Sequence, residues 1–324
     1  MKKKWNGFQS FLAEEIGKFV AHKRALGRKF ATEEGALRLL DNYLFKKELL
    51  NIMEMTPELI EKFLTSRPRH QPRSYNHLLN VTSGFFKWLV MQGLCPHFPI
   101  YMRPKRAVVH RIPFLFKAQQ LLSIASQLPD NNSAPQRGNA YFMIFALLYG
   151  LGLRVGEVSR LQREDIDFNR RLLIIRQTKF AKSRLVPFGS KMAQRLQEYL
   201  QQHEQYYGAW KLDSPVFSFT RGRSIHPCTI SQTFHHLVPL LNLTIPPGVS
   251  SPRLHDLRHS FAVGTLLRWY HEGINPTQRL LHLSTFLGHV DPLSTAVYIT
   301  ITEDFLKEAN QRFEQFIPVS IKEN

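Results

Sequence analysis

Three side chains that can hold an anion and move a proton, His255, Arg258 and His259, follow one another at steps of three and one. In a helix this spacing puts all three on one face. Pro252 suits the first position of a helix and Ser251 its cap, so the face is expected within the first turns. There the unpaired N–H groups and the helix dipole favour negative charge. The pattern therefore predicts a site for a phosphate oxygen.

A tyrosine follows at a fixed distance from a further histidine. Nine residues separate His289 from Tyr298, and a tyrosine hydroxyl can act as a covalent nucleophile. The spacing of His255 and His259 also occurs on the helix of zinc proteases. That motif requires Glu directly after the first histidine, whereas this chain has Asp256 there, and Arg258 would repel a metal ion. We therefore expect no metal and no other cofactor.

The charge of the chain favours a polyanionic partner. Its 324 residues, 43% of them hydrophobic, are enough for two domains with substantial cores. The formal net charge is +18. Residues 1–110 hold 19 Lys and Arg against 9 Asp and Glu, hence +10, and the remainder of the chain supplies the other +8. Nucleic acid is the first candidate for this polyanion and an acidic membrane surface the second. Because both halves are basic, we expect both to contact it, as a clamp would.

The sequence carries no sign of export or of a membrane anchor. Cys95 and Cys228 are far apart and lack metal-type spacing, so a disulfide framework is not expected. The N-terminal residues include no apolar run typical of a signal peptide. No stretch reaches the roughly 20 apolar residues that span a bilayer. We expect a cytoplasmic, nucleoid-associated protein without a membrane partner.

The first 94 residues predict a compact helical domain. Helices are expected at 8–26, after a cap at Thr32, after Thr56–Pro57, and at 74–92. Residues 95–113 contain four prolines among basic residues, which indicates an extended linker close to DNA. The basic residues expected to contact DNA, in these regions and in the hairpin of the second domain, are Lys23, Arg24, Arg28, Lys29, Arg69, Arg73, Arg103, Lys105, Arg106, Lys182 and Arg184.

Residues 114–324 predict a second domain of mixed composition. Helices are expected at 117–127, 139–149, 190–206, 228–241, 252–270, 276–287 and, after a cap at Thr302, 303–315. A helix beginning at Arg154 follows the glycine-rich break at 150–152. Strands at 171–176 and 184–188 form a hairpin with a lysine on its turn, and 215–219 is expected as a third short strand. The whole chain is thus expected to be mainly α with a small antiparallel β-sheet.

Several motifs, in order, resemble those of the tyrosine recombinases, also called the phage integrase family. They are Gly152-Leu153-Arg154-Val155-Gly156-Glu157, Lys179 on its hairpin before Arg184-Leu185-Val186-Pro187, His255-Asp256-Leu257-Arg258-His259-Ser260-Phe261-Ala262, Leu287-Gly288-His289, and Tyr298. The resemblance covers about residues 110–316. The helical first domain is similar only in outline to the core-binding domain of that family.

The resemblance implies a site-specific recombinase that needs neither metal nor ATP. Arg154 and Arg258 would clamp a DNA phosphate with paired donors that remain charged. His289 would add a third hydrogen bond. Tyr298, whose ordinary pKa is about 10, would attack and form a 3′-phosphotyrosine, with His255 taking its proton.

The leaving 5′-oxygen would receive its proton from a lysine on the hairpin turn. Lys179 fits the family spacing, although Thr178 and Phe180 stand where glycines are common, so Lys182 remains an alternative. His259 is expected to support the site without taking part in catalysis.

The resemblance also implies the partners. They are an inverted-repeat core site on DNA, a dimer on that site, and a tetramer in synapsis. Two other functions remain open: a DNA-binding protein of the same fold that no longer cuts, and a relaxase like the type IB topoisomerases.

Overall fold

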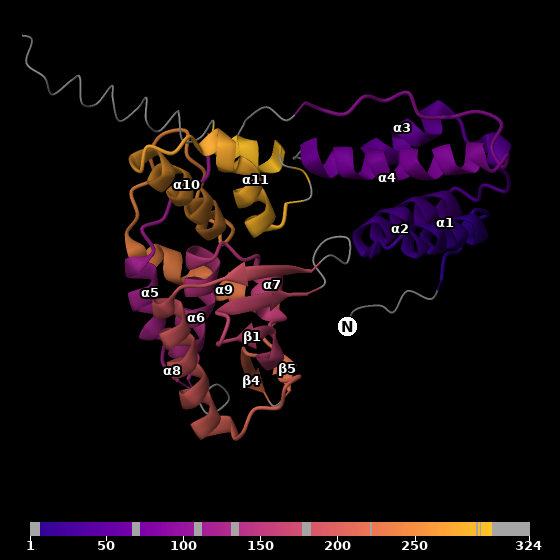
Figure 1. The fold of residues 1–324 in the computed structure, drawn as a ribbon. Coiled ribbons are helices and arrows are strands. Elements are labelled where there is room, and N and C mark those ends of the chain that lie inside the picture. Colours follow the sequence, from indigo (N-terminus) through magenta and orange to yellow (C-terminus); the bar gives the residue numbers. More distant parts are fainter. Residues whose placement is uncertain are drawn as a thin grey trace, which may run out of the picture. The chain divides into compact units, whose positions relative to one another are not determined.

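The chain forms two compact units, residues 1–110 and 111–324 (Figure 1). The computed structural model describes residues 7–66, 72–106, 112–130, 136–176, 183–220, 222–289, 291 and 293–299. Helices dominate both units, and the described strands form two small antiparallel sheets in the second unit. The expected fold class is confirmed. None of the helices in these ranges is long and apolar enough to cross a membrane.

Four helices build the first unit around one apolar core. They are α1 (Ala13–Ala25), α2 (Ala31–Lys46), α3 (Pro57–Thr65) and α4 (Pro72–Met91), with a short 3-10 turn at Ile52–Glu54. Helix α4 contacts the other three. Within the core the rings of Phe19, Phe85 and Trp88 lie with centroids 5.4 to 6.4 Å apart. The aromatic residues that keep the helical period thus pack inward.

The helix boundaries of the first unit differ from expectation at two starts. Helix α1 begins at Ala13, because Phe8 and Phe11 pack on the core from outside the helix. Phe30, in a left-handed conformation, precedes α2, so Thr32 is not its cap. The predicted cap of α3 is confirmed, since Thr56 accepts a hydrogen bond from the Leu59 amide.

The beginning of the expected linker belongs to the first unit. Cys95 and Ile100 are buried in its core. Farther along, the side-chain amide of Asn76 in α4 pairs with both the amide and the carbonyl of Lys105, at 2.8 Å each. Residues 107–111 lie outside the described ranges, as do residues 67–71 of the expected basic turn.

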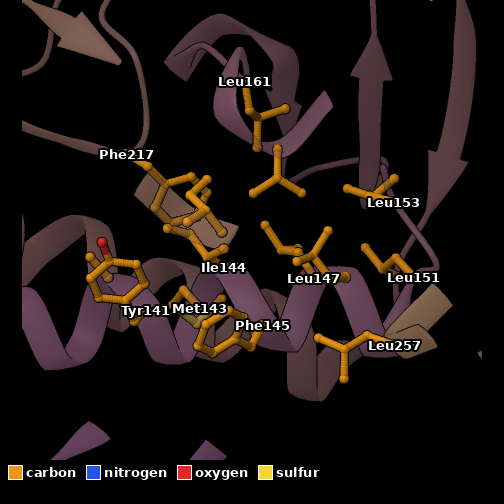
Figure 2. Close-up of a cluster of buried hydrophobic side chains, with 14 of the residues drawn as sticks. Tyr141, Met143, Ile144, Phe145, Leu147, Leu151, Leu153, Leu161, Phe217 and Leu257 are labelled. Carbon is orange, nitrogen blue, oxygen red and sulfur yellow. The ribbon is translucent and has the colours of Figure 1, made fainter. Parts of the chain in front are cut away.

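The second unit is organised around the apolar helix α6 (Arg137–Gly150). Figure 2 shows Tyr141, Ile144, Phe145 and Leu147 of this helix among the packed side chains of the core. The other helices of this unit are α5 (Gln119–Ser126), α7 (Val155–Ser159), α8 (Ser190–Tyr207), α9 (Pro227–Leu237), α10 (Asp256–His271) and α11 (Pro276–Leu287). Helices α5, α8 and α10 all contact α6, so this helix fixes the position of much of the unit.

The hairpin predicted in the second unit is confirmed and belongs to a three-stranded sheet. Strand β2 (Leu172–Ile175) pairs antiparallel with β3 (Arg184–Pro187) and with β1 (Ile166–Asp167), which the sequence analysis missed because it is only two residues long. The turn of the hairpin, 177–182, lies outside the described residues. The predicted strand at 215–219 is shifted to β4 (Ser218–Thr220), which pairs with β5 (Arg223–Ser224) in a separate sheet.

Helix α10 starts later than the Ser251–Pro252 signal suggests. Its first residue is Asp256, and His255 occupies the cap position. The Asp256 carboxylate accepts hydrogen bonds from the backbone and the side chain of Arg253, which ties the preceding turn to the helix start. The expected helix at 228–241 likewise ends at Leu237 and continues as the 3-10 turn Val238–Leu241.

The predictions for α11 are confirmed at both ends. Asn275 caps its start by accepting a hydrogen bond from the Thr277 amide, and Gly288 ends it with a positive φ of 67°. Residues 293–299 are helical and carry Tyr298. The expected helix at 303–315 lies outside the described residues.

Candidate active site

Three arginine side chains converge on the C-terminal end of α11, where a helix leaves its last carbonyl groups without partners. Arg184, Arg258 and Arg154 donate, in that order, to the carbonyl oxygens of Phe286, Leu287 and Gly288, at 2.9, 2.7 and 2.8 Å. The negative end of the helix dipole favours such cations. Side chains from β3, α10 and the start of α7 are thereby held around the segment that leads to His289.

The carboxylate of Glu157 joins two of these arginines. It accepts hydrogen bonds from Arg184 at 2.8 and 2.9 Å, and from the Arg154 side chain and backbone amide at 2.8 Å each. Only 2% of its side chain is exposed. Burial by itself raises the pKa of this carboxyl, but the hydrogen bonds and charge of Arg184, together with those of Arg154, lower the pKa to about 2. Glu157 is therefore ionised throughout the working pH range.

Arg258 is the most deeply buried arginine of the cluster. Its side chain, on a residue only 1% exposed, donates to the Gly152 carbonyl at 2.5 Å in addition to its bond at the end of α11. Burial, with the nearby charge of Arg154, lowers the pKa of Arg258 to about 10. The guanidinium stays charged at neutral pH, in a setting where low polarity strengthens its attraction for an anion.

Tyr298 lies beside this arginine cluster and is hydrogen-bonded to a histidine. Its hydroxyl oxygen is 2.8 Å from Nδ1 of His259, and the residue is 3% exposed. Burial raises the pKa of Tyr298 by more than the nearby charges of Arg258 and Arg154 lower it. Loss of the phenolic proton therefore needs an acceptor close by.

The histidine in contact with the tyrosine is not the one expected. His255 was expected to take the proton, with His259 in support, but His259 makes the hydrogen bond. His255 is exposed and packs edge-on against His259, with ring centroids 4.7 Å apart. The reason lies in the later start of α10. His255 occupies the cap position, whereas His259 lies one turn inside the helix.

His289 is held by the short helix that carries the tyrosine. Its Nδ1 is 2.6 Å from the Thr295 hydroxyl, and its ring lies nearly parallel to that of Tyr298 at 6.3 Å. Burial, together with the charge of Arg258, lowers the pKa of His289 to about 4. Burial and the charge of Arg253 lower the pKa of His259 to about 4 as well. Both rings are therefore neutral at physiological pH and able to accept a proton.

The structure thus brings together five of the six residues that the sequence analysis assigned to catalysis: Arg154, His255, Arg258, His289 and Tyr298. The sixth, Lys179, and its alternative Lys182 lie outside the described residues. Glu157 and Thr295 were missed as parts of the site. The three-residue step from Arg154 to Glu157, which is typical of a capping box, was the signal for the first of them. Thr295 had no signal in the sequence.

The expected DNA contacts divide into three groups. The residues that are at least partly exposed and remain predicted contacts are Lys23, Arg24, Arg28, Lys29, Arg73, Arg103, Lys105 and Arg106. Arg69 and Lys182 lie outside the described residues. The predicted DNA contact of Arg184 is corrected, because its side chain is 10% exposed and donates to Glu157 and the Phe286 carbonyl. Its guanidinium is thus directed into the protein.

Comparison with known proteins places this site in a family. Residues 116–304 match the model of the phage integrase family. The chain belongs to the phage integrase family. The membership expected from the motifs is confirmed, and with it the enzyme class of the tyrosine recombinases. Site-specific DNA recombination is the activity that this membership supports.

Individual relatives cover nearly the whole chain. A protein of Sinorhizobium fredii named as an integrase/recombinase, y4rB, is 33% identical over 320 residues, which are 94% of this chain and 98% of that protein. Tyrosine recombinase XerC of Oceanobacillus iheyensis is 27% identical over 84% of this chain and 85% of its own length.

Two solved structures share the fold at low sequence identity. The XerH site-specific recombinase bound to a palindromic difH substrate has a TM-score of 0.66 at 16% identity, covering 92% of this chain and 84% of its own. The integrase of transposon Tn1549 in complex with transposon right end DNA has a TM-score of 0.62 at 17% identity, covering 90% and 94%.

Proposed function

We propose that this recombinase cuts and rejoins DNA through a covalent bond between Tyr298 and a 3′-phosphate. The observation that carries the proposal is the buried tyrosine hydroxyl, which is hydrogen-bonded to a neutral histidine beside a cluster of arginines. A buried phenol that only packed would need a hydrogen-bond partner, but it would not need the cluster of arginines beside it. The family membership and the DNA-bound state of the two structural relatives support DNA as the substrate.

In the cleavage step the oxygen of Tyr298 attacks the phosphorus of a phosphodiester. The phenolic proton passes to Nδ1 of His259, the new P–O bond forms, and the bond to the 5′-oxygen breaks. A proton donor must reach the 5′-oxygen, and a lysine of the hairpin turn, Lys179 or Lys182, is proposed for this role. Rejoining reverses the step with a new 5′-hydroxyl, so the energy of the phosphoester is retained and no ATP is required.

The positive groups stabilise charge that grows on the non-bridging oxygens. Arg154, with 32% of its side chain exposed, is the arginine of the cluster most open to a ligand. Arg258 supplies a buried charge behind it, and His289 can donate from the ring nitrogen that does not face Thr295. One preorganised donor of this kind is worth about 3–4 kcal/mol in the transition state.

A nicked DNA substrate tests the chemistry directly, because the short cleaved end dissociates and leaves the covalent adduct trapped. Substrates would be chosen from genomic fragments that the protein itself retains. We expect denaturing electrophoresis to show a protein–DNA adduct with the wild type and none with Tyr298→Phe, at unchanged DNA affinity. An adduct that persists in Tyr298→Phe would show that another residue is the nucleophile.

The same substrates distinguish the other two functions. Retention of DNA without any adduct from the wild type would favour a protein kept for binding alone. Relaxation of supercoiled plasmid that lacks any retained sequence would favour a topoisomerase-like enzyme. If retained fragments share an inverted repeat and bind two protomers, the proposed dimer on a core site is supported. Tetramer formation would then be measured on paired sites by sedimentation.

A further inference from the structure

Arg184 differs from the other two arginines of the cluster in what it can reach. Its guanidinium donates twice to Glu157 and once to the Phe286 carbonyl. Its side chain is 10% exposed, against 32% for Arg154. A residue so enclosed is badly placed to hold a phosphate, although it stands on the strand that leads from the hairpin turn. Its role must be exerted through its neighbours.

Charge balance indicates what that role is. Glu157 fixes Arg154 through its backbone amide and its side chain. If these two residues stood alone, the carboxylate would cancel the charge of Arg154, and the pair would attract an anion weakly. Arg184 supplies a second cation to the same carboxylate through two parallel hydrogen bonds, the strongest geometry for such a pair. The trio then keeps a net charge of +1, and the exposed member is Arg154.

The backbone of Gly288 makes room for Arg184. A Cβ on Gly288 would lie 2.8 Å from Nη1 and 3.0 Å from Cζ and Cδ of Arg184. The same glycine needs a positive φ of 67° to end α11, and its carbonyl accepts the bond from Arg154. The start of β3 and the end of α11 are therefore packed through one guanidinium. His289 follows directly on this contact.

From these contacts we infer that Arg184 is a positioning residue for Arg154. It neutralises Glu157, so that Glu157 can orient Arg154 without cancelling the charge that Arg154 offers to the DNA phosphate. This role rests on the proposed function. It differs from a DNA contact by Arg184, which would act independently of the charge on Glu157. It also differs from a purely structural ion pair, which would change stability without changing the rate of the folded protein.

A double-mutant cycle with Arg184→Met and Glu157→Gln tests the inference on the full chain. We expect Arg184→Met to slow adduct formation at saturating DNA by about tenfold or more, with little change in DNA affinity. Adding Glu157→Gln should restore at least part of the loss, because the carboxylate that captures Arg154 is gone. In the wild-type background Glu157→Gln should be harmful. Coupling of this sign is not expected from independent roles.

Two additional measurements keep the test decisive. Without Arg184, burial should raise the pKa of Glu157. Mild acidification should then neutralise the carboxylate and raise the rate of Arg184→Met, as Glu157→Gln does, where the wild type stays constant. Arg184→Lys keeps the charge but not the paired bonds, and should lose less than Arg184→Met. Thermal unfolding of all four proteins of the cycle needs no DNA. Glu157→Gln should destabilise the wild type more than it destabilises Arg184→Met.

Three outcomes would overturn the inference. If the rate reduction of the double variant equals the product of the reductions in the two single variants, the two residues have independent roles. Arg184→Met could instead lower the salt dependence of DNA binding by about one phosphate contact and leave the rate at saturating DNA unchanged. That result would indicate that Arg184 contacts DNA. Equal destabilisation by Glu157→Gln in both backgrounds would contradict the pairing itself. The unfolding result decides the pairing even if the wild type forms no adduct, which would count against the proposed function alone.

Discussion

A buried carboxylate of the first unit and the arginine cluster of the second unit bury charge for different purposes. In the described part of the first unit, the buried charged side chain is Asp41, which is 2% exposed and whose two oxygens accept hydrogen bonds from the backbone amides of Gln9 and Ser10 at 2.8 and 2.9 Å. Those bonds tie the segment before α1 to α2. In the second unit, Glu157 and Arg258 are buried together with Arg184 close by, and like charges face one another around Tyr298.

The difference separates a structural buried charge from a functional one. Asp41 accepts hydrogen bonds from local backbone groups, so its removal should affect folding. The cluster in the second unit holds three arginines against one carboxylate and lowers the pKa of Arg258 by burial and repulsion. Like charges held close together cost free energy. Such an arrangement is expected where a ligand of opposite charge binds. Variants at Asp41 should therefore change stability, whereas variants in the cluster around Tyr298 should change activity.

The largest effect is expected at the histidine that contacts the tyrosine. His259→Gln retains a side chain able to hydrogen-bond with Tyr298 but removes the proton acceptor. We expect adduct formation to slow by about 10²- to 10⁴-fold, while the unfolding temperature changes little. Single-turnover cleavage of the nicked substrate measures the rate, and calorimetry measures the unfolding.

The matched control is His255→Gln, one turn earlier on the same helix. We expect a smaller loss from this variant, because His255 is exposed and packs against His259, which makes the hydrogen bond to the tyrosine. Should His255→Gln abolish cleavage while His259→Gln remains active, the proton acceptor would be His255, and the hydrogen bond to His259 would belong to the resting state.

The opposite result is expected in the first unit. Asp41→Asn replaces one carboxylate oxygen by an amide group that cannot accept a backbone N–H, and the loss of a hydrogen bond to a charged acceptor should reduce the free energy of unfolding by about 1.5–3 kcal/mol. Cleavage by the folded protein should be unchanged. Denaturant unfolding measures the first quantity. Glu33→Gln, in the first turn of the same helix, removes an equal charge without those bonds and should be much milder.

How well the sequence predicted these features depends on how local their causes are. The cap at Thr56, the start and end of α11 and the β2–β3 pairing follow from neighbouring residues, and all were predicted. The predicted start of α10 was wrong, because contacts of Asp256 with Arg253 compete with the Ser251–Pro252 signal. Such competition cannot be seen from spacing alone.

The members of the site were predicted better than their contacts. Motif order assigned Arg154, Arg258, His289 and Tyr298 to one site, and the structure brings them together. The hydrogen bond of His259 to Tyr298 and the inward direction of Arg184 depend on how α10, α11 and β3 meet. The strand is far from both helices in the sequence, and helical periodicity says nothing about which side chain of a face reaches a partner on another element.

The smallest effect concerns acid. In the second unit His203, His259 and His289 each have a pKa lowered by burial to about 4, from about 6.5 in an unfolded chain. The unfolded chain therefore binds protons first as the pH falls. The stability contributed by the neutral rings is complete above about pH 6.5 and is lost between there and about pH 4.

Hydrogen exchange, corrected for the intrinsic rate at each pH, can compare both units within one chain. We expect protection in α8 and α10 to decrease from pH 7 to pH 5 by more than protection in α2 and α4. An equal decrease in both units would mean that the pKa values of the buried histidines are not lowered in the folded state, and the argument for a neutral His259 from its lowered pKa would fail with it.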